Sequence, residues 1–187
     1  MLSVIIPTQD SERALVSTLA ALVPAAMEGF IAEVVIADAG SRDETAAVAD
    51  VAGCKFRLLE GPLGARLKTA AASARAPWLL FLRPGTVLDA AWVGETRRFI
   101  ERPSAKSCAA TFRRGAPGEP ALREALRLLA VALGAMPRPE QGLIIFKRFY
   151  EDIGGHAENV ADPEADLIGR IGRRRLARLA SIAATVG

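Results

Sequence analysis

The sequence predicts an α/β fold with a mostly parallel central sheet and helices on both of its faces. The main observation is that short apolar, β-branched runs alternate with longer segments of helical periodicity through the first half of the chain. The composition agrees, since 51% of the residues are hydrophobic but 5% are aromatic, which suits helices packed on a sheet. At 187 residues the chain is large enough to bury its own core, so we expect one domain over residues 1–187.

The first half of the chain contains four predicted strands, each leading into a helix or a turn. The first strand is short, β-branched and closed by a proline, as is typical of a buried parallel strand. Asp10 or Ser11 is expected to cap the first helix, which ends at Gly29. Ser41 and Glu44 match the capping-box pattern that opens a second helix. The predicted strands are residues 2–6, 33–38, 55–59 and 78–82, and the third helix is residues 65–75.

The second half of the chain is less regular. It contains no internal repeat, low-complexity tract or linker, which supports the prediction of one domain. Helices are predicted at residues 89–101, 120–133, 149–153 and 163–175, strands at 106–113 and 142–147, and a loop at 113–120.

Charge and cysteine content exclude several classes of protein. The net charge of +3 is too small to indicate nucleic acid as a partner. Cys54, Cys108 and the single histidine, His156, do not have the spacing of zinc ligands, and two isolated cysteines favour thiols in a reducing compartment. The N-terminus starts a strand without a signal-peptide pattern, and no apolar run reaches about 18 residues. We therefore expect a cytoplasmic protein.

Two strand ends carry the candidate site, because ligands of open α/β sheets bind beyond the carboxyl ends of strands. After the second strand, Asp38 and Gly40 precede a helix N-terminus, an arrangement that suits a nucleotide but also suits a simple capped turn. After the fourth strand, the chain turns at Arg83, Pro84 and Gly85, where a pair of metal-binding acids would be expected. The residues alone leave open whether this second turn binds a phosphorylated ligand.

Several segments resemble, in order along nearly the whole chain, family 2 glycosyltransferases of the GT-A fold. These segments are SVIIPT (3–8), DAGSRDET (38–45), LLFLRPGT (79–86), QGLIIFKR (141–148), YEDIGG (150–155) and EADLIGR (164–170). Proteins of that family transfer a sugar from a nucleotide-diphospho-sugar to an acceptor hydroxyl, usually with inversion. The resemblance implies a GT-A fold, a donor of the UDP or GDP type and an acceptor that it does not name.

The resemblance also assigns residues to two halves of the chain. Residues 1–88 would form the nucleotide-binding half and residues 89–187 the acceptor-side half. The expected nucleotide-binding residues are Pro7, Thr8, Asp10, Asp38, Gly40, Arg66 and Arg83, with Asp38 meeting the uracil or the ribose. The expected acceptor-side residues are Gln141, Gly154, Gly155 and His156, where His156 either hydrogen-bonds a sugar hydroxyl or has no catalytic role.

This sequence departs from the family pattern at the positions that carry chemistry. The metal-binding acid falls on Gly85 and its companion on Arg83, so no metal ligand is assigned and a manganese or magnesium site is in question. One hypothesis is that Arg83 binds the diphosphate in place of a metal, since a guanidinium can hydrogen-bond two phosphate oxygens at once. The other hypothesis is that Arg83 is only a solvated residue at the end of the strand. The family's catalytic base falls on Glu164, with Asp166 as the substitute if the alignment shifts.

A basic run near the C-terminus has three interpretations. It is a solvated helix face, a phosphate-binding lip over the donor, or a surface that contacts anionic lipid headgroups as a peripheral membrane protein. The run consists of Arg170, Arg173, Arg174, Arg175 and Arg178, with Leu176 and Leu179 on an apolar face if the segment is helical.

Two functions remain after the sequence is considered as a whole. The first is a glycosyltransferase that could act without a metal. The second is a catalytically silent GT-A domain that binds a nucleotide or a partner protein. A dehydrogenase is disfavoured because no G-x-G-x-x-G motif follows a strand.

Overall fold

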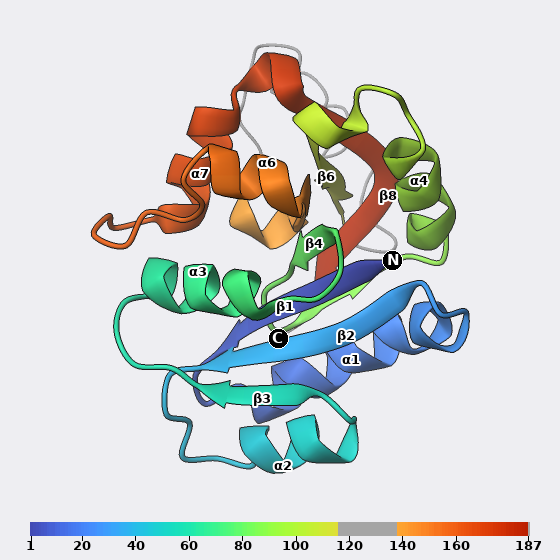
Figure 1. Cartoon of the computed structure of the whole chain (residues 1–187). Helices are drawn as coiled ribbons and strands as arrows, with labels where there is room; N and C mark the ends of the chain where they lie inside the picture. Colours follow the sequence, from blue (N-terminus) through green and yellow to red (C-terminus); the bar gives the residue numbers. More distant parts are fainter. Residues whose placement is uncertain (116–137, 187) are drawn as a thin grey trace.

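The computed structural model describes residues 1–115 and 138–186, which share one eight-stranded sheet in the order β3-β2-β1-β4-β7-β6-β8-β5 (Figure 1). The strands are β1 (Leu2–Thr8), β2 (Ile31–Asp38), β3 (Lys55–Leu58), β4 (Trp78–Phe81), β5 (Thr86–Leu88), β6 (Ala109–Arg114), β7 (Leu143–Phe146) and β8 (Leu176–Thr185). The α-helices are α1 (Glu12–Met27), α2 (Thr45–Val51), α3 (Leu63–Ser73), α4 (Trp92–Ile100), α6 (Lys147–Asp152) and α7 (Pro163–Ile171). Three short 3-10 helices are η1 (Ala105–Ser107), η2 (Pro139–Gln141) and η3 (Arg173–Arg175).

The first half of the sheet is parallel, as predicted. Strand β1 pairs in parallel with β2 and β4, and β2 pairs in parallel with β3. The register places Thr8 opposite Asp38, and the amide of Leu82 continues the β4 pairing by donating to the carbonyl of Ile5 at 3.1 Å. The carboxyl ends of β1, β2 and β4 therefore meet at one edge of the sheet.

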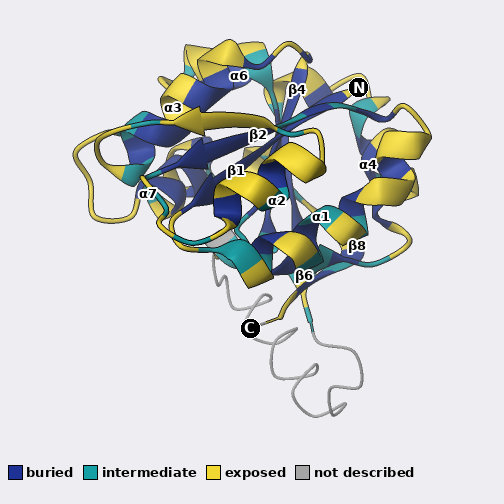
Figure 2. Cartoon of the chain, turned by 90° about the horizontal axis from the view of Figure 1, so that it is seen from below, coloured by how far each residue is buried: buried dark blue, intermediate teal, exposed yellow. Residues whose placement is uncertain are grey.

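Helices cover both faces of this sheet (Figure 2). On one face, side chains of α1, α2 and α4 pack with Val4 and Ile6; on the other, side chains of α3, α6 and α7 pack with Ile5. Successive residues of β1 thus enter different cores, because side chains alternate across a strand. Trp78 and Trp92 belong to the first of these cores and are 5% and 2% exposed.

The prediction of a helix through residue 175 is wrong. Helix α7 ends at Ile171, because Gly172 adopts a φ of 73°, and the chain then enters η3 and the ten-residue strand β8. Strand β8 pairs in parallel with β6 and in antiparallel fashion with β5, and in Figure 1 it is the long curved red ribbon. Leu179, 6% exposed, is therefore buried on a strand and not on a helix face.

Other differences are smaller. Strand β5 has no counterpart in the predictions, and the expected strand at 106–113 begins with η1 before β6 starts. The predicted helix at 120–133 lies outside the described residues. Within the part of the chain that is described, no helix combines the length and apolar character needed to cross a membrane.

Candidate active site

Asp38 fastens the turn that follows β2. Asp38 is 1% exposed, and its carboxylate accepts hydrogen bonds from the hydroxyl of Thr8 at 2.7 Å, the amide of Gly40 at 2.8 Å and the amide of Ser41 at 2.7 Å. Burial by itself raises the pKa of Asp38, but the hydrogen bonds from Ser41, Thr8 and Gly40 outweigh burial and lower it. Asp38 is therefore ionised and committed to holding the ends of β1 and β2 together.

The turn after β2 is also joined to the turn after β1. Asp10, at a φ of 47°, accepts from the amide of Arg42 at 2.7 Å, and the amide of Asp10 donates to Ser41 Oγ at 2.9 Å. The carboxylate of Asp43 accepts from the amide of Glu12 at 3.0 Å and thereby caps α1 from the neighbouring loop.

The helix caps predicted from the sequence are wrong. Neither Ser11 at the start of α1 nor Glu44 at the start of α2 makes a side-chain cap hydrogen bond. Ser41 is used by Asp38 and Asp10, so it is not available for a capping box with Glu44. The two turns were predicted correctly as turns, but the cap of α2 comes from Asp43, whose Oδ1 accepts from the amide of Thr45 at 3.0 Å, and not from Ser41 and Glu44.

Arg66 reaches the same edge of the sheet from α3. It is 8% exposed, and its Nη1 donates to the carbonyls of Ala37 at 2.7 Å and Thr8 at 3.4 Å. Its Nε has no hydrogen-bond partner among the described residues, and burial lowers the pKa of the guanidinium. Arg66 thus brings positive charge to the strand ends beside Asp38. Of the other expected nucleotide-binding residues, Pro7 is buried in β1 and Gly40 has a φ of 93°.

Arg83 and Glu164, 81 positions apart in the sequence, form an ion pair beyond the end of β4. Arg83 Nε donates to Glu164 Oε2 at 2.8 Å, and Arg83 Nη2 donates to the same oxygen. The Glu164 side chain is 10% exposed, whereas that of Arg83 is 36% exposed. Burial raises the pKa of Glu164 despite the hydrogen bond and charge of Arg83. The expected diphosphate-binding residue and the expected base therefore lie in direct contact.

Two further acids surround this ion pair. Glu140 Oε1, in η2, lies 3.8 Å from Arg83 Nη1, and Glu140 Oε2 is buried without a partner among the described residues. Burial lowers the pKa of Arg83, but the charges of Glu164, Glu140 and Asp162 outweigh burial and raise it. Glu140 was not predicted as a site residue, although it directly precedes Gln141 in the segment that resembles the family.

The residues at the family's metal positions do not fit a divalent metal. Position 83 supplies a cation, and Gly85 has a φ of 84°, a conformation that residues with a side chain rarely adopt. A Cβ at position 85 would stand 2.6 Å from the carbonyl oxygen of Val186. Among the described residues, no group of three histidine, cysteine or acidic side chains is arranged to hold a metal.

His156 lies inside the protein, next to Glu164. It is 1% exposed, and its Nδ1 lies 2.9 Å from the hydroxyl oxygen of Tyr150. Its ring packs edge-on against the ring of Phe81, with 4.8 Å between the ring centroids. Burial lowers the pKa of His156 to about 3, so the ring is neutral at physiological pH. His156 and Glu164 line a cavity of about 10 Å³, room for about one water molecule.

The remaining acceptor-side residues shape the loops around this histidine. Gly155, with a φ of 65°, packs against Tyr150, where a Cβ would come within 2.9 Å of the ring; Gly154 also has a positive φ, of 87°. Gln141 Nε2 donates to the carbonyl of Phe112 at 2.7 Å and so joins η2 to β6.

Arg170 and Asp166 form a separate pair on α7. Arg170 Nε donates to Asp166 Oδ2 at 2.8 Å, and its other nitrogens donate to the carbonyls of Ile153 and Gly155 at 2.6 Å each. The interpretation of residues 170–178 as one basic helix face is therefore wrong. Arg170 secures the glycine loop to α7, while Arg174 and Arg175 lie in η3 and Arg178 lies on β8.

The chain belongs to glycosyl transferase family 2, whose model matches residues 3–165. No curated protein sequence matches the chain at a significant level.

Solved structures of the GT-A fold resemble the chain closely in shape and weakly in sequence. S. aureus TarS 1–349 in complex with UDP-GlcNAc has a TM-score of 0.75 at 16% identity, covering 100% of this chain and 59% of that one. The mannosyltransferase PcManGT from Pyrobaculum calidifontis, in complex with GDP-Man and Mn2+, has a TM-score of 0.76 at 15% identity, covering 98% of this chain and 56% of that one. Glucosyl-3-phosphoglycerate synthase from Mycobacterium tuberculosis, with Mn2+ and UDP, has a TM-score of 0.68 at 16% identity, covering 100% and 72%. The chain thus has the GT-A fold and spans less than two thirds of the first two relatives.

Proposed function

We propose that this chain binds a UDP- or GDP-linked sugar at the carboxyl ends of β1, β2 and β4 and transfers the sugar to an acceptor hydroxyl without a metal. The observation that carries the proposal is the contact between Arg83 and Glu164 at 2.8 Å. It supplies a phosphate-binding cation and a buried carboxylate at one point beyond the strand ends. Thr8, Asp10, Asp38, Gly40, Pro7 and Arg66 are the proposed nucleotide-binding residues.

The proposed reaction is a single displacement. Glu164 accepts the proton of the acceptor hydroxyl, and the hydroxyl oxygen forms a bond to the anomeric carbon of the sugar. The bond from that carbon to the diphosphate oxygen breaks, and its electron pair leaves with the nucleoside diphosphate. Arg83 stabilises the charge that develops on the departing oxygens. The raised pKa of Glu164 supports this role, because a base works best when its pKa lies nearer the working pH.

The second candidate is a GT-A domain that binds a nucleotide without turnover. The observation that favours it is that Arg83 is already neutralised by Glu164, with Glu140 3.8 Å away. A cation whose charge is already balanced by neighbouring carboxylates attracts a diphosphate less strongly.

Hydrolysis of the donor separates these two candidates. Purified protein is incubated with UDP- and GDP-sugars in EDTA, and release of UDP or GDP is followed in the wild type and in Glu164→Gln. Glu158→Gln is the matched control, because Glu158 forms an exposed surface pair with Lys68 at 3.2 Å. Slow release that is lost in Glu164→Gln and kept in Glu158→Gln supports the transferase. Binding without release supports the silent domain, and neither binding nor release contradicts both.

The acceptor is proposed to approach from the half formed by residues 89–187. Gln141, Gly154, Gly155 and His156 shape the loops of that half, and the enclosed His156 is proposed to act through the Glu164 pocket and not by touching the acceptor. Cys54 and Cys108 are unpaired thiols, which supports the proposal of a reducing, cytoplasmic location.

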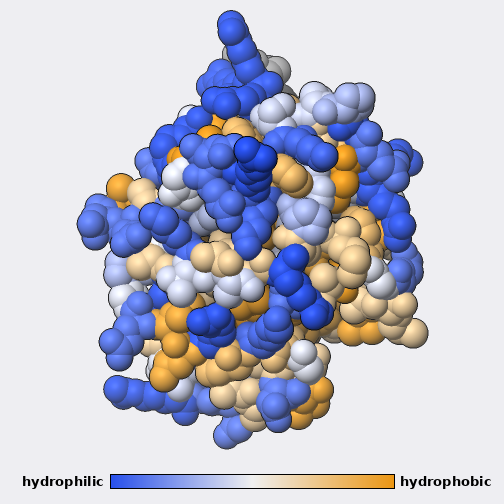
Figure 3. Space-filling view, viewed as in Figure 1, coloured by the Kyte–Doolittle hydropathy of each residue, from blue (hydrophilic) through white to orange (hydrophobic). Residues whose placement is uncertain are grey.

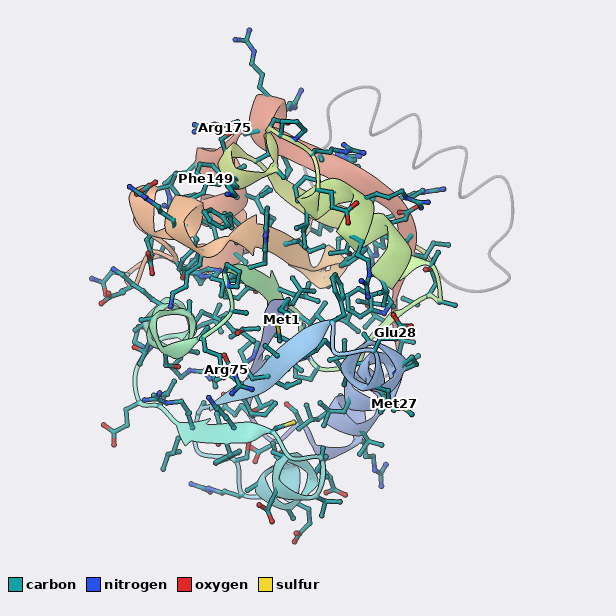
Figure 4. All side chains as sticks on the ribbon, turned by 45° about the vertical axis from the view of Figure 1, so that its right-hand side comes forward. Met1, Met27, Glu28, Arg75, Phe149 and Arg175 are labelled. Atoms are coloured by element: carbon teal, nitrogen blue, oxygen red, sulfur yellow. The ribbon has the colours of Figure 1, made fainter. Side chains whose placement is uncertain are left out.

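Contact with an anionic membrane surface is the proposed role of the remaining basic residues. Hydrophilic side chains gather over the η3 end of the molecule (Figure 3), and Arg175 stacks on the ring of Phe149 at 5.4 Å (Figure 4). Arg174, next to Arg175 in the chain, is also exposed, while Arg170 is not part of this surface because it donates to the carbonyl of Ile153. Co-sedimentation with vesicles that contain anionic lipid tests the proposal, and binding that does not depend on the anionic fraction, or survives Arg174→Glu with Arg175→Glu, contradicts it.

A further inference from the structure

The guanidinium of Arg83 has more acidic neighbours than it can satisfy. Its Nε and Nη2 are directed at one oxygen of Glu164, and its Nη1 faces Glu140 Oε1 at 3.8 Å. Asp162 adds a third negative charge to this environment. With all three carboxylates ionised, the group around Arg83 is net negative, which opposes the arrival of a diphosphate.

We infer that the donor's diphosphate and Glu164 compete for the guanidinium of Arg83, so that Glu164 is released as a base when the donor binds. This inference rests on the proposed function. Charge-assisted bonds to a guanidinium are directional, and the two nitrogens that face Glu164 cannot also face a phosphate in the same orientation. Arg83 is 36% exposed, so its outer side is open to a ligand, whereas Glu164 is enclosed and stays in place.

The exchange has a consequence for the order of events. Before the donor binds, Glu164 Oε2 accepts two hydrogen bonds and is a poor proton acceptor. Once Arg83 turns to the diphosphate, the enclosed carboxylate loses its cation and becomes more basic, because burial disfavours its charged form. Glu164 is then ready for the acceptor hydroxyl only in the presence of donor, and Glu140 is a positioning residue that helps to hold Arg83 in the donor-free arrangement.

The competition makes an unusual prediction about affinity: removing the base strengthens donor binding. The dissociation constant of UDP- and GDP-sugars is measured by calorimetry in EDTA for the wild type, Glu164→Gln, Glu140→Gln and the control Glu158→Gln. We expect Glu164→Gln to bind at least about tenfold more tightly, since a charge-assisted hydrogen bond no longer competes. Glu140→Gln should strengthen binding by less, because its carboxylate lies 3.8 Å from Arg83 Nη1, beyond hydrogen-bond distance, and Glu158→Gln should leave binding unchanged.

The outcomes distinguish this inference from the proposed function. If all variants bind donor and Glu164→Gln binds no more tightly than the wild type, the competition is refuted while the proposed function stands. If no variant binds any nucleotide sugar, the proposed function fails as well. Thermal unfolding of each variant is recorded first, and because Glu140→Gln changes a residue at the rim of the group, it tests the competition even if Glu164→Gln does not fold.

Discussion

Asp38 and Glu164 are both enclosed carboxylates of the candidate site, yet they are held in opposite ways. Asp38 accepts from amides and hydroxyls of the turns around it, at 2.7 to 2.8 Å, and its pKa is lowered. Glu164 accepts from a single guanidinium, and burial raises its pKa. Fixed backbone donors compensate a buried charge fully, whereas one mobile side chain compensates it only in part.

The difference separates a structural turn from the proposed reactive centre. The partners of Asp38 cannot leave without opening the ends of β1 and β2, so this region keeps one arrangement. The partner of Glu164 sits at the end of a flexible side chain with 36% exposure, so this region has an alternative arrangement available when a ligand binds. We therefore expect substitutions of Asp38 to affect stability first, and nucleotide binding through the loss of the turn, whereas substitutions of Glu164 should affect binding and chemistry directly.

The largest effect is expected for Asp38→Ala. The change leaves the amides of Gly40 and Ser41 and the hydroxyl of Thr8 without their acceptor in an enclosed site, so the free energy of unfolding should fall by about 3 kcal/mol. Urea unfolding measures this loss, and Asp38→Asn, which keeps one oxygen acceptor, should lose less. A loss under about 1 kcal/mol for Asp38→Ala would show that the turn does not depend on this carboxylate.

Gly85 provides the next test, on the side of Glu164. Alanine at this φ of 84°, with its Cβ 2.6 Å from the Val186 carbonyl, should lower the free energy of unfolding by about 2 kcal/mol. Gly94→Ala is the matched control, because its added Cβ meets nothing within 4 Å and its position in α4 favours alanine. Equal thermal midpoints for the two variants would mean that the turn after β4 tolerates a side chain at position 85, and that the fold does not require glycine there.

His156 gives an effect that grows with acidity. Its folded pKa of about 3 lies below its usual 6.5, so between these values the unfolded chain binds more protons and stability falls as the pH falls. The slope from this residue should approach about 1.4 kcal/mol per pH unit below pH 6. Chemical unfolding from pH 7.5 to 4.5, compared with His156→Gln, isolates it. If both proteins lose stability equally on acidification, the enclosed histidine is not the cause.

The smallest effect on stability is expected for Glu164→Gln. The pKa of Glu164 is raised in the folded protein, so the folded protein binds more protons than the unfolded chain and the free energy of unfolding rises as the pH falls. At neutral pH the ionised carboxylate of Glu164 therefore adds little to stability. A neutral amide should therefore change the free energy of unfolding at pH 7 by less than about 0.5 kcal/mol. Urea unfolding at pH 7 provides the value, and a loss as large as that of Asp38→Ala would remove the contrast between the two carboxylates.

Much of this molecule could be predicted from its sequence, and the exceptions have physical causes. The parallel strands were predictable because runs such as Trp78–Phe81 are wholly apolar and end at turn residues. Strand β8 was missed because its alanines and Arg178 also fit a helix, although Gly172 marked the end of α7. The positions of Arg83 and Glu164 were expected from the family resemblance, but their pairing joins residues 81 apart and depends on how α7 packs against the sheet. Glu140 belongs to no periodic pattern, so only its distance from Arg83 reveals it.

The most direct test of the account is the affinity for a UDP- or GDP-sugar of the wild type and of Arg83→Gln, measured once in EDTA and once in EDTA-free buffer with manganese. We predict that the wild type binds in EDTA, that manganese changes its dissociation constant by less than twofold, and that Arg83→Gln weakens binding by at least about tenfold. Binding that requires manganese, or that is unaffected in Arg83→Gln, would contradict the claim that this guanidinium holds the diphosphate.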